Sequence, residues 1–195
     1  MIDFSVDPFV HFENLLKIAE DKKVLEPNAM ALATTDDHGK PSVRIVYYKG
    51  MVRGGFSFYT NYLGRKGKEI EKNPNVCVNF FWPNLAQQVR ISGRAEKLTR
   101  EESEAYFATR HRTSQIGAWA SNQSAMIPGY EHFEQGVQSY EQKFAGQEIP
   151  CPPHWGGYHI LPEEIEFWFG HEGRLHERYI YQRGETGWKT FMRAP

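Results

Sequence analysis

Short apolar runs separated by turn residues recur through most of this chain, and they constrain its fold more than any other feature. They predict strands over residues 29–35, 42–49, 56–60, 76–82, 87–98, 157–161, 165–170, 175–183 and 188–193. Apolar residues at helical spacing and capping signals predict helices over residues 8–22, 65–72, 99–110, 114–121 and 131–144. The strands do not alternate with helices as βαβ units require, so we predict an α+β fold, a barrel-like sheet with peripheral helices.

Two of the predicted helices have clear start signals. Asp7 is a suitable N-cap residue, and Pro8 follows it in the first turn. Thr99 and Glu102 have the spacing of a capping box, in which each side chain bonds to the backbone N–H of the other residue. These signals fix the expected starts of the first and third helices.

The length and charge of the chain limit what it can do. Its 195 residues suffice for one substantial domain, so we expect a single domain over residues 1–195, with residues 1–27 as an N-terminal helix and lid region. A formal net charge of −1 provides no overall field that would attract nucleic acid or an anionic membrane, and neither is expected as a partner. An anionic ligand would need a local basic site.

The N-terminus and the cysteines indicate a cytoplasmic protein. The first residues are acidic rather than basic, unlike a signal peptide, and no apolar run is long enough to span a bilayer. Cys77 and Cys151 lie far apart, without a CxxC motif or a neighbouring histidine cluster. We therefore expect two free thiols, a reducing compartment and no metal site.

Common catalytic and nucleotide-binding motifs are missing. The sequence contains no GxGxxG at the start of a helix, no GxxxxGK[ST], no GxSxG and no HExxH. Any chemistry must therefore come from another arrangement of residues.

Basic residues gather at two points in the first half of the chain. Arg44 lies inside an apolar strand, and Arg65-Lys66 stands where a loop enters a helix. Backbone N–H groups at a helix start, with two cations beside them, would bind a phosphate group. A solvated helix start explains Arg65 and Lys66 equally, so both interpretations stay open.

A second set is formed by Tyr106, Arg110 and Ser114, which are spaced by four residues. If one helix continues through all of them, they line up on one face, and their phenol, guanidinium and hydroxyl groups would suit a phosphate ester. The alternative is a polar outer face of the helix.

A third set is formed by Arg174, His176 and Arg178. On a strand these side chains would point to the same side and could bind an anion or an electron-rich ring. A charged edge strand is the alternative. Trp119, Trp155 and Trp168 are expected in the core, where most tryptophans lie.

Eight stretches, in this order and with fitting spacing, resemble the pyridoxamine 5'-phosphate oxidase family: RIVYYKG, FYTNYLGRKG, QVRISGRAEKL, YFATRHRTSQIGAWASNQS, PPHWGGY, IEFWFG, RLHERYIY and RAP. The resemblance runs over residues 28–195, and SQIGAWAS and RLHER are its most specific parts. It implies an FMN-binding split β-barrel that forms a homodimer with two flavin sites at the subunit interface.

The resemblance also implies roles for individual residues. The positions that match flavin-binding stretches are Arg44, Ile45, Val46, Tyr59, Thr60, Arg65, Lys66, Gln88, Gln123, Ser124, Trp168 and Arg178. The positions that match the substrate-phosphate set are Lys49, Tyr106, Arg110 and Ser114. Arg174 and His176 match the catalytic pair that lies over the pyridine ring of the substrate.

The implied reaction is the oxidation of pyridoxamine or pyridoxine 5'-phosphate to pyridoxal 5'-phosphate, with FMN as cofactor and dioxygen as acceptor, giving hydrogen peroxide. Two alternatives stay open: a related FMN oxidase of phenazine biosynthesis, which would lack the substrate-phosphate set, and a non-catalytic flavin- or haem-binding split barrel. The chain also departs from the family pattern. Glu26 stands where an aspartate is frequent, Phe169 stands where a glutamine is common, and the basic and tyrosine residues of an N-terminal lid are not evident.

Overall fold

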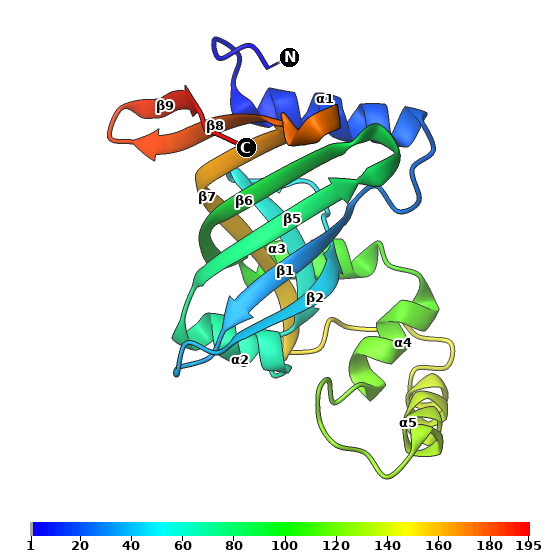
Figure 1. Cartoon of the computed structure of the whole chain (residues 1–195). Coiled ribbons are helices and arrows are strands. Elements are labelled where there is room, and N and C mark those ends of the chain that lie inside the picture. Colours follow the sequence, from blue (N-terminus) through cyan, green and yellow to red (C-terminus); the bar gives the residue numbers. More distant parts are fainter. Residues whose placement is uncertain (1) are drawn as a thin grey trace.

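A nine-stranded antiparallel sheet forms the body of the molecule (Figure 1). The computed structural model describes residues 2–195. The strands are β1 (Ala29–Thr35), β2 (Pro41–Tyr47), β3 (Met51–Val52), β4 (Gly55–Asn61), β5 (Asn75–Trp82), β6 (Gln87–Lys97), β7 (Trp155–Phe169), β8 (Glu177–Gly184) and β9 (Gly187–Met192). Their order is β2-β1-β5-β6-β7-β4-β3, and β8 and β9 extend the sheet from the far half of β7.

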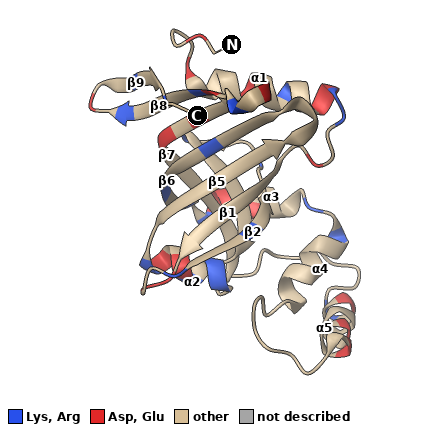
Figure 2. Cartoon of the chain, in the orientation of Figure 1, with Lys and Arg blue, Asp and Glu red and all other residues tan. Residues whose placement is uncertain are grey.

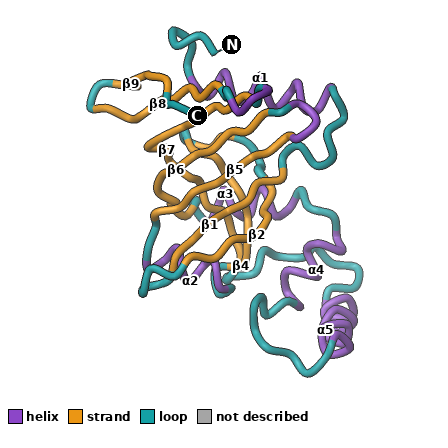
Figure 3. The backbone as a smooth tube through the Cα atoms, viewed as in Figure 1, coloured by secondary structure: helices purple, strands orange, loops and turns teal. Residues whose placement is uncertain are grey.

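The sheet closes because one segment belongs to both of its ends. β2 pairs with β1, and residues 48–50 carry the chain directly on into β3, which pairs with β4. The backbone N–H of Lys49 donates to the Ser57 carbonyl at 2.9 Å, which ties this connection to β4. The sheet therefore curls into a barrel, and Figure 3 shows its strands wrapped around a common interior.

Alternate residues of the strands fill the barrel interior. β1 and β5 each alternate buried and more exposed residues, the period of a strand with one face in a core. Helix α1 (Pro8–Asp21) covers one end of the barrel, and the Phe12 ring lies 4.9 Å from the rings of both Phe56 and Phe80. Asp7 caps this helix, and Thr99 and Glu102 form the predicted capping box at the start of α3 (Arg100–Ala108).

The remaining helices lie toward the opposite end. They are α2 (Arg65–Lys72), α4 (Arg112–Ala120) and α5 (Tyr130–Lys143). α4 and α5 stand beside the barrel rather than against its main core (Figure 1). Phe107, Ile116, Phe144 and Trp155 form a small second apolar cluster that joins these helices to the start of β7.

The N-terminal residues are anchored at the α1 end of the barrel. The Tyr181 hydroxyl of β8 donates to the carbonyls of Asp3 and Val6, both at 3.1 Å, and the Phe4 ring packs edge-on against Tyr179 and Tyr181. The described part of the expected lid, residues 2–27, therefore lies along the barrel and α1. Met1 lies outside the described residues.

The structure corrects one prediction in the sheet. Residues 157–161 and 165–170 were expected as two strands, but β7 is continuous from Trp155 to Phe169. The pairing with β6 shifts register between Ser92 and Gly93, so that Glu163 is an extra residue beside Pro162. This bulge accommodates Pro162 within the strand, because a bulged strand tolerates a missing ladder donor.

The conditions for two side-chain alignments considered from the sequence are not met. The chain turns at Thr109–His111, between α3 and α4, so Tyr106, Arg110 and Ser114 do not share one helix. A short 3₁₀ turn, η2 (Glu172–Arg174), precedes β8, which begins only at Glu177. Gly173 and Arg174 have φ angles of 65° and 62°, left-handed values that no strand contains, so Arg174 and His176 do not alternate with Arg178 on a strand.

Candidate active site

A cavity of about 730 Å³ opens between the barrel and α4. Its walls come from β2, β4, the start of α2, the α3–α4 junction and the start of β7. The structure brings to it, of the residues selected from the sequence, Ile45, Val46, Lys49, Tyr59, Thr60, Lys66, Tyr106, Arg110, Ser114 and Gln123. Arg65 and Ser124 line an adjoining cavity of about 560 Å³ that also includes Gln123.

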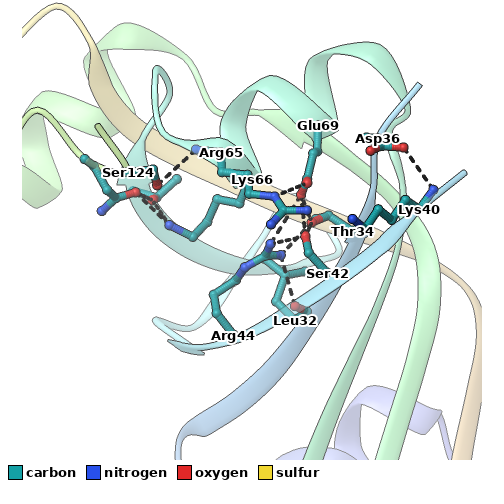
Figure 4. A network of polar contacts seen from close by, with 12 residues as sticks. Leu32, Thr34, Asp36, Lys40, Ser42, Arg44, Arg65, Lys66, Glu69 and Ser124 are labelled. Carbon is teal, nitrogen blue, oxygen red and sulfur yellow. Dashed lines mark hydrogen bonds and ion pairs between the residues drawn. The ribbon is translucent and has the colours of Figure 1, made fainter. Parts of the chain in front are cut away.

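Positive charge at this end of the barrel is local. Lysine and arginine are scattered among acidic residues over the whole molecule, in keeping with the near-zero net charge (Figure 2). Arg44 of β2 and Arg65 and Lys66 of α2 lie close together at this end (Figure 4), and of these three Lys66 lines the larger cavity and Arg65 the adjoining one.

Arg44 lines neither cavity and is held by a network of polar contacts between β2 and α2 (Figure 4). Its guanidinium donates to the hydroxyls of Thr34 and Ser42, each at 2.5 Å, and to the Glu69 carboxylate at 3.2 Å. Arg65 reaches the same carboxylate through Nε at 2.7 Å. One carboxylate thus fixes two guanidinium groups and leaves an excess of positive charge.

Glu69 stays ionised although it is buried. Burial opposes its charge, but hydrogen bonds from Thr34, Ser42 and Arg65 outweigh this effect and lower the pKa of Glu69 to about 2. Glu69 was not selected from the sequence. Its spacing of four residues from Arg65 on a predicted helix was the signal that could have identified it.

Lys66 points from α2 into the cavity. Its ammonium donates to the Thr60 hydroxyl at 3.1 Å and to the Gln123 side-chain oxygen at 2.7 Å. Burial, with the nearby positive charge of Arg44, lowers the pKa of Lys66. The Ser124 hydroxyl accepts the backbone N–H of Arg65 at 3.2 Å. The loop that carries Gln123 and Ser124 is thereby held at the start of α2, a suitable place for an anion.

Ser124 also has an unusual backbone. Its φ angle is 68°, in the left-handed region that non-glycine residues rarely adopt. Arg174 shares this property. Such conformations cost free energy and are often found where a functional group must be held in place.

Arg110 lies at the α3–α4 junction with an unsatisfied donor. Its Nη1 atom is buried and has no hydrogen-bond partner within residues 2–195. Burial lowers the pKa of Arg110. Tyr106 and Ser114 line the same cavity, and Lys49 lines it from the end of β2. The predicted phosphate set therefore converges in space, although its members do not share a helix.

The other selected residues form a second group, outside this cavity. Gln88, Trp168 and Arg178 are direct neighbours across β6, β7 and β8. His176 lies beside them, its ring 4.7 Å from the Trp168 ring, and Arg174 precedes it in η2. The structure thus divides the predicted site residues into two groups within one chain.

A buried carboxylate lies behind this second group as well. Glu166 accepts hydrogen bonds from Arg178 at 2.9 and 3.0 Å and from Arg90 at 2.6 Å. Arg193, near the C-terminus, is 3.4 Å from the same carboxylate. The arrangement resembles that of Glu69 in the first group, and Glu166 was also not selected from the sequence.

Comparisons with known proteins identify the family. The family model described as pyridoxamine 5'-phosphate oxidase matches residues 17–144, and the model described as the pyridoxine 5'-phosphate oxidase C-terminal dimerisation region matches residues 155–195. The chain belongs to the pyridoxamine 5'-phosphate oxidase family. The resemblance stated from the sequence motifs is confirmed.

Members of the pyridoxamine 5'-phosphate oxidase family align with 97–100% of this chain. The pyridoxine/pyridoxamine 5'-phosphate oxidase of Bdellovibrio bacteriovorus is 59% identical over 196 residues and covers 100% of both chains. The corresponding protein of Leptospira biflexa is 48% identical over 189 residues, which are 97% of this chain and 89% of the relative.

Solved structures agree on the fold, and the predicted α+β split barrel is confirmed. PhzG from Burkholderia lata, solved with tetrahydrophenazine-1-carboxylic acid, has a TM-score of 0.92 and 30% identity, with coverage of 97% of this chain and 93% of the other. An FMN-binding protein from Nostoc punctiforme has a TM-score of 0.78 at 15% identity and covers 97% and 99% of the two chains.

The departures from the family pattern have clear places in the structure. Glu26 accepts a hydrogen bond from the Tyr47 hydroxyl, with both carboxylate oxygens at 3.0 Å, and Tyr47 lines the cavity. Phe169 packs edge-on against Tyr179 in the sheet. No residue of the segment 2–27 lines the cavity in this chain.

Proposed function

We propose that this chain is the FMN-dependent oxidase that converts pyridoxamine or pyridoxine 5'-phosphate to pyridoxal 5'-phosphate, with dioxygen as acceptor and hydrogen peroxide as product. The observation that carries the proposal is a cavity with two separate cationic sets. One consists of Lys66 in the cavity wall, with Arg65 in the adjoining cavity and Arg44 bonded to the same carboxylate as Arg65, and the other is centred on Arg110. A phosphorylated cofactor and a phosphorylated substrate need two such sets.

The first set fits the phosphate of FMN. Arg44 and Arg65 exceed the charge of Glu69, and Lys66 adds a further ammonium. The Ser124 hydroxyl lies at the start of α2, where backbone dipoles favour an anion. Ile45, Val46, Tyr59, Thr60 and Gln123 line the cavity beside these groups and would contact the rest of the cofactor. FMN, when bound, supplies the two-electron oxidation and the reaction with dioxygen.

The second set fits the phosphate of the substrate. Arg110 has a buried donor without a partner, and leaving such a group unpaired is costly, so it favours a ligand that accepts its hydrogen bond. Tyr106 of α3, Ser114 of α4 and Lys49 after β2 line the same cavity and would add contacts. Binding energy gained at the phosphate fixes the approach of the reacting carbon, which lies elsewhere on the substrate.

The site is completed by a second copy of the chain. Val43, Ile45 and Tyr47 are all more than 40% exposed on the outer face of β2, an apolar surface that favours burial between subunits. The C-terminal segment matches a dimerisation region, which supports a homodimer. Because Gln88, Trp168, Arg178, Arg174 and His176 lie outside the cavity of their own chain, we assign them to the cavity of the second copy.

Within that dimer, Arg174 and His176 have the catalytic positions. Arg174 would lie over the pyridine ring and hold the reacting carbon toward the flavin. His176 is fixed by the backbone N–H of His171, which donates to its Nδ1 at 3.1 Å, and it would position Arg174 or the polar edge of the substrate. The reaction needs no protein nucleophile.

The phenazine oxidase alternative has one observation in its favour, the TM-score of 0.92 with PhzG. That fold is common to both branches. The converging phosphate set of Lys49, Tyr106, Arg110 and Ser114 favours a phosphorylated substrate, as does the higher identity to pyridoxine/pyridoxamine 5'-phosphate oxidases.

The test is an assay on the purified protein. We expect a yellow protein that releases FMN, not FAD, on denaturation and forms pyridoxal 5'-phosphate from both phosphorylated substrates. Arg110→Ala should raise KM by one to two decades with flavin content unchanged, because a charge-assisted hydrogen bond is worth roughly 1.5–3 kcal/mol. A protein that binds flavin but forms no aldehyde would overturn the proposal.

A further inference from the structure

Trp155 lies beside both Tyr106 and Arg110, two members of the substrate-phosphate set. It is the first residue of β7, is only 5% exposed and lines the cavity. Its indole is nearly parallel to the rings of Tyr59 and Tyr106, with interplanar angles of 14° and 5°. Tyr59 and Tyr106 stack with their ring centroids 3.8 Å apart. The two tyrosines are therefore stacked, and the indole lies alongside them in nearly parallel orientation, 5.5 Å from the Tyr59 centroid and 6.3 Å from the Tyr106 centroid.

The backbone of β7 is adapted to this stack. A Cβ atom on Gly157 would lie 2.8 Å from the Tyr59 ring and 2.6 Å from the Leu98 side chain. Glycine at this position allows the Tyr59 ring to lie directly over the strand, next to Trp155. Tyr106 is thus held by ring contacts on the cavity wall.

The Arg110 guanidinium lies over the same indole. Its central carbon is 4.6 Å from the Trp155 ring and 5.6 Å from the Phe107 ring. No carboxylate within residues 2–195 forms an ion pair with Arg110. A cation over an aromatic face is attracted without using its N–H groups, so this contact fixes the guanidinium and leaves its donors free.

We propose that Trp155 is a positioning residue for the substrate phosphate, an inference that rests on the proposed function. Its indole holds the Arg110 guanidinium by a cation–π contact and packs alongside the stacked pair of Tyr59 and Tyr106. Both donors are then fixed before the phosphate arrives, which reduces the entropy lost on binding. The Glu69 carboxylate orients Arg44 and offsets its positive charge, whereas the Trp155 ring orients Arg110 without offsetting its charge.

A purely structural role for Trp155 predicts a different result, because Trp155 also belongs to the apolar cluster with Phe107 and Ile116. Loss of packing alone would impair phosphorylated and unphosphorylated substrates alike. Loss of positioning should affect only the phosphorylated ones. Pyridoxamine and pyridoxamine 5'-phosphate form the matched pair of substrates that separates these two roles.

The experiment compares Trp155→Leu and Trp155→Phe in the FMN-loaded enzyme. For Trp155→Leu we expect KM for pyridoxamine 5'-phosphate to rise about tenfold with kcat within about twofold, and the kinetics of pyridoxamine to stay unchanged. Trp155→Phe keeps an aromatic face and should restore most of the affinity. The matched control is Trp119→Leu, which removes an indole that packs on Tyr140 and Phe144 but does not contact Arg110.

A second measurement does not depend on turnover or on a folded leucine variant. Inorganic phosphate is titrated calorimetrically into enzyme in which all tryptophans are replaced by 5-fluorotryptophan, since ring fluorination weakens the negative face of the indole. Weaker phosphate binding is expected in the otherwise wild-type chain and no effect in Trp155→Phe. Equal effects in both chains, or equal losses for the two substrates with Trp155→Leu, would overturn the role of Trp155. An inactive wild-type enzyme whose phosphate affinity still depends on Trp155 would instead count against the proposed function alone.

Discussion

Two buried carboxylates hold arginines in the two groups of candidate site residues. Glu69 holds Arg44 and Arg65 beside the cavity, and Glu166 holds Arg178 on the sheet. In each case the arginine bonds to a group that is almost fully buried, so its position is set by the core rather than by solvent. Breaking such a pair by removing one partner leaves an unpaired charge, which is strongly destabilising.

Glu69 should make stability depend on pH in the acid range. Its pKa of about 2 in the folded protein lies below the ordinary value of 4.5, so its contribution is complete above about pH 4.5 and disappears as the pH falls toward 2. At neutral pH, Glu69→Gln should lower the free energy of unfolding by an amount on the order of 2–3 kcal/mol. Urea unfolding of flavin-free protein at several pH values measures this. A difference between variant and wild type that stays constant from pH 7 to pH 2.5 would contradict the prediction.

Arg174 and Arg178 should separate catalysis from flavin retention. Arg174→Ala should lower kcat/KM by about ten- to a hundredfold with flavin still bound, because it removes orientation of the substrate. Arg178→Ala should instead weaken flavin retention, and His176→Ala should resemble Arg174→Ala with a smaller effect. Steady-state rates combined with flavin content from the visible spectrum distinguish the variants. Full activity of Arg174→Ala would leave that residue without a role in the site.

At the scale of elements, local sequence signals located most strands and helices. The features that these signals missed depend on contacts between residues that are distant in sequence. α2 begins and ends at the predicted residues because Asn73-Pro74 stops it, and the capping box at Thr99 is local too. The bulge at Glu163 arises from the register between β7 and β6, two strands that are distant in sequence. The same limit applied to the site. Arg110 could be selected by its spacing, but the ring of Trp155 beneath it could not.

The start of α2 depends on a glycine. A Cβ atom on Gly67 would lie 2.0 Å from the Tyr62 carbonyl oxygen, so Gly67→Ala must push the helix away from the loop before it. We expect a loss of roughly 1–3 kcal/mol of stability together with weaker FMN binding, since Arg65 and Lys66 move with the helix. Gly136→Ala in α5 is the control, because its nearest neighbours lie at 3.7 Å or beyond. Thermal unfolding and flavin fluorescence titration give both readouts, and equal behaviour of the two variants would contradict the prediction.

At the scale of the whole molecule, one sheet joins the two segments that match separate family models. β6 belongs to the first and β7 to the second, and they pair from Gln87–Phe169 to Lys97–Tyr158. We therefore propose that residues 2–195 form one folding unit. Within the described residues, no helix is long and apolar enough to cross a bilayer.

The outer face of β2 should control assembly. Val43 is 68% exposed, and Val43→Glu would place a charge in an interface that we expect to be apolar. We expect this variant to be monomeric by light scattering and to lose FMN, because the second copy no longer completes the site. Leu25→Glu alters a residue that is 89% exposed and lies outside this face, and it should remain dimeric. A Val43→Glu dimer that retains its flavin would place the interface elsewhere.

The central position of β7 has a consequence for how the chain is made. β4 and β6 both pair with β7, yet all of α3, α4 and α5 are synthesised between β6 and β7. On the ribosome the barrel therefore stays open, with two unpaired strand edges, until residues 155–169 have emerged. Pairings between segments so distant in sequence form slowly, and open edges associate readily with other chains. A nascent chain of this protein is thus most exposed to aggregation, and most dependent on chaperones, in the interval between the synthesis of β6 and that of β7.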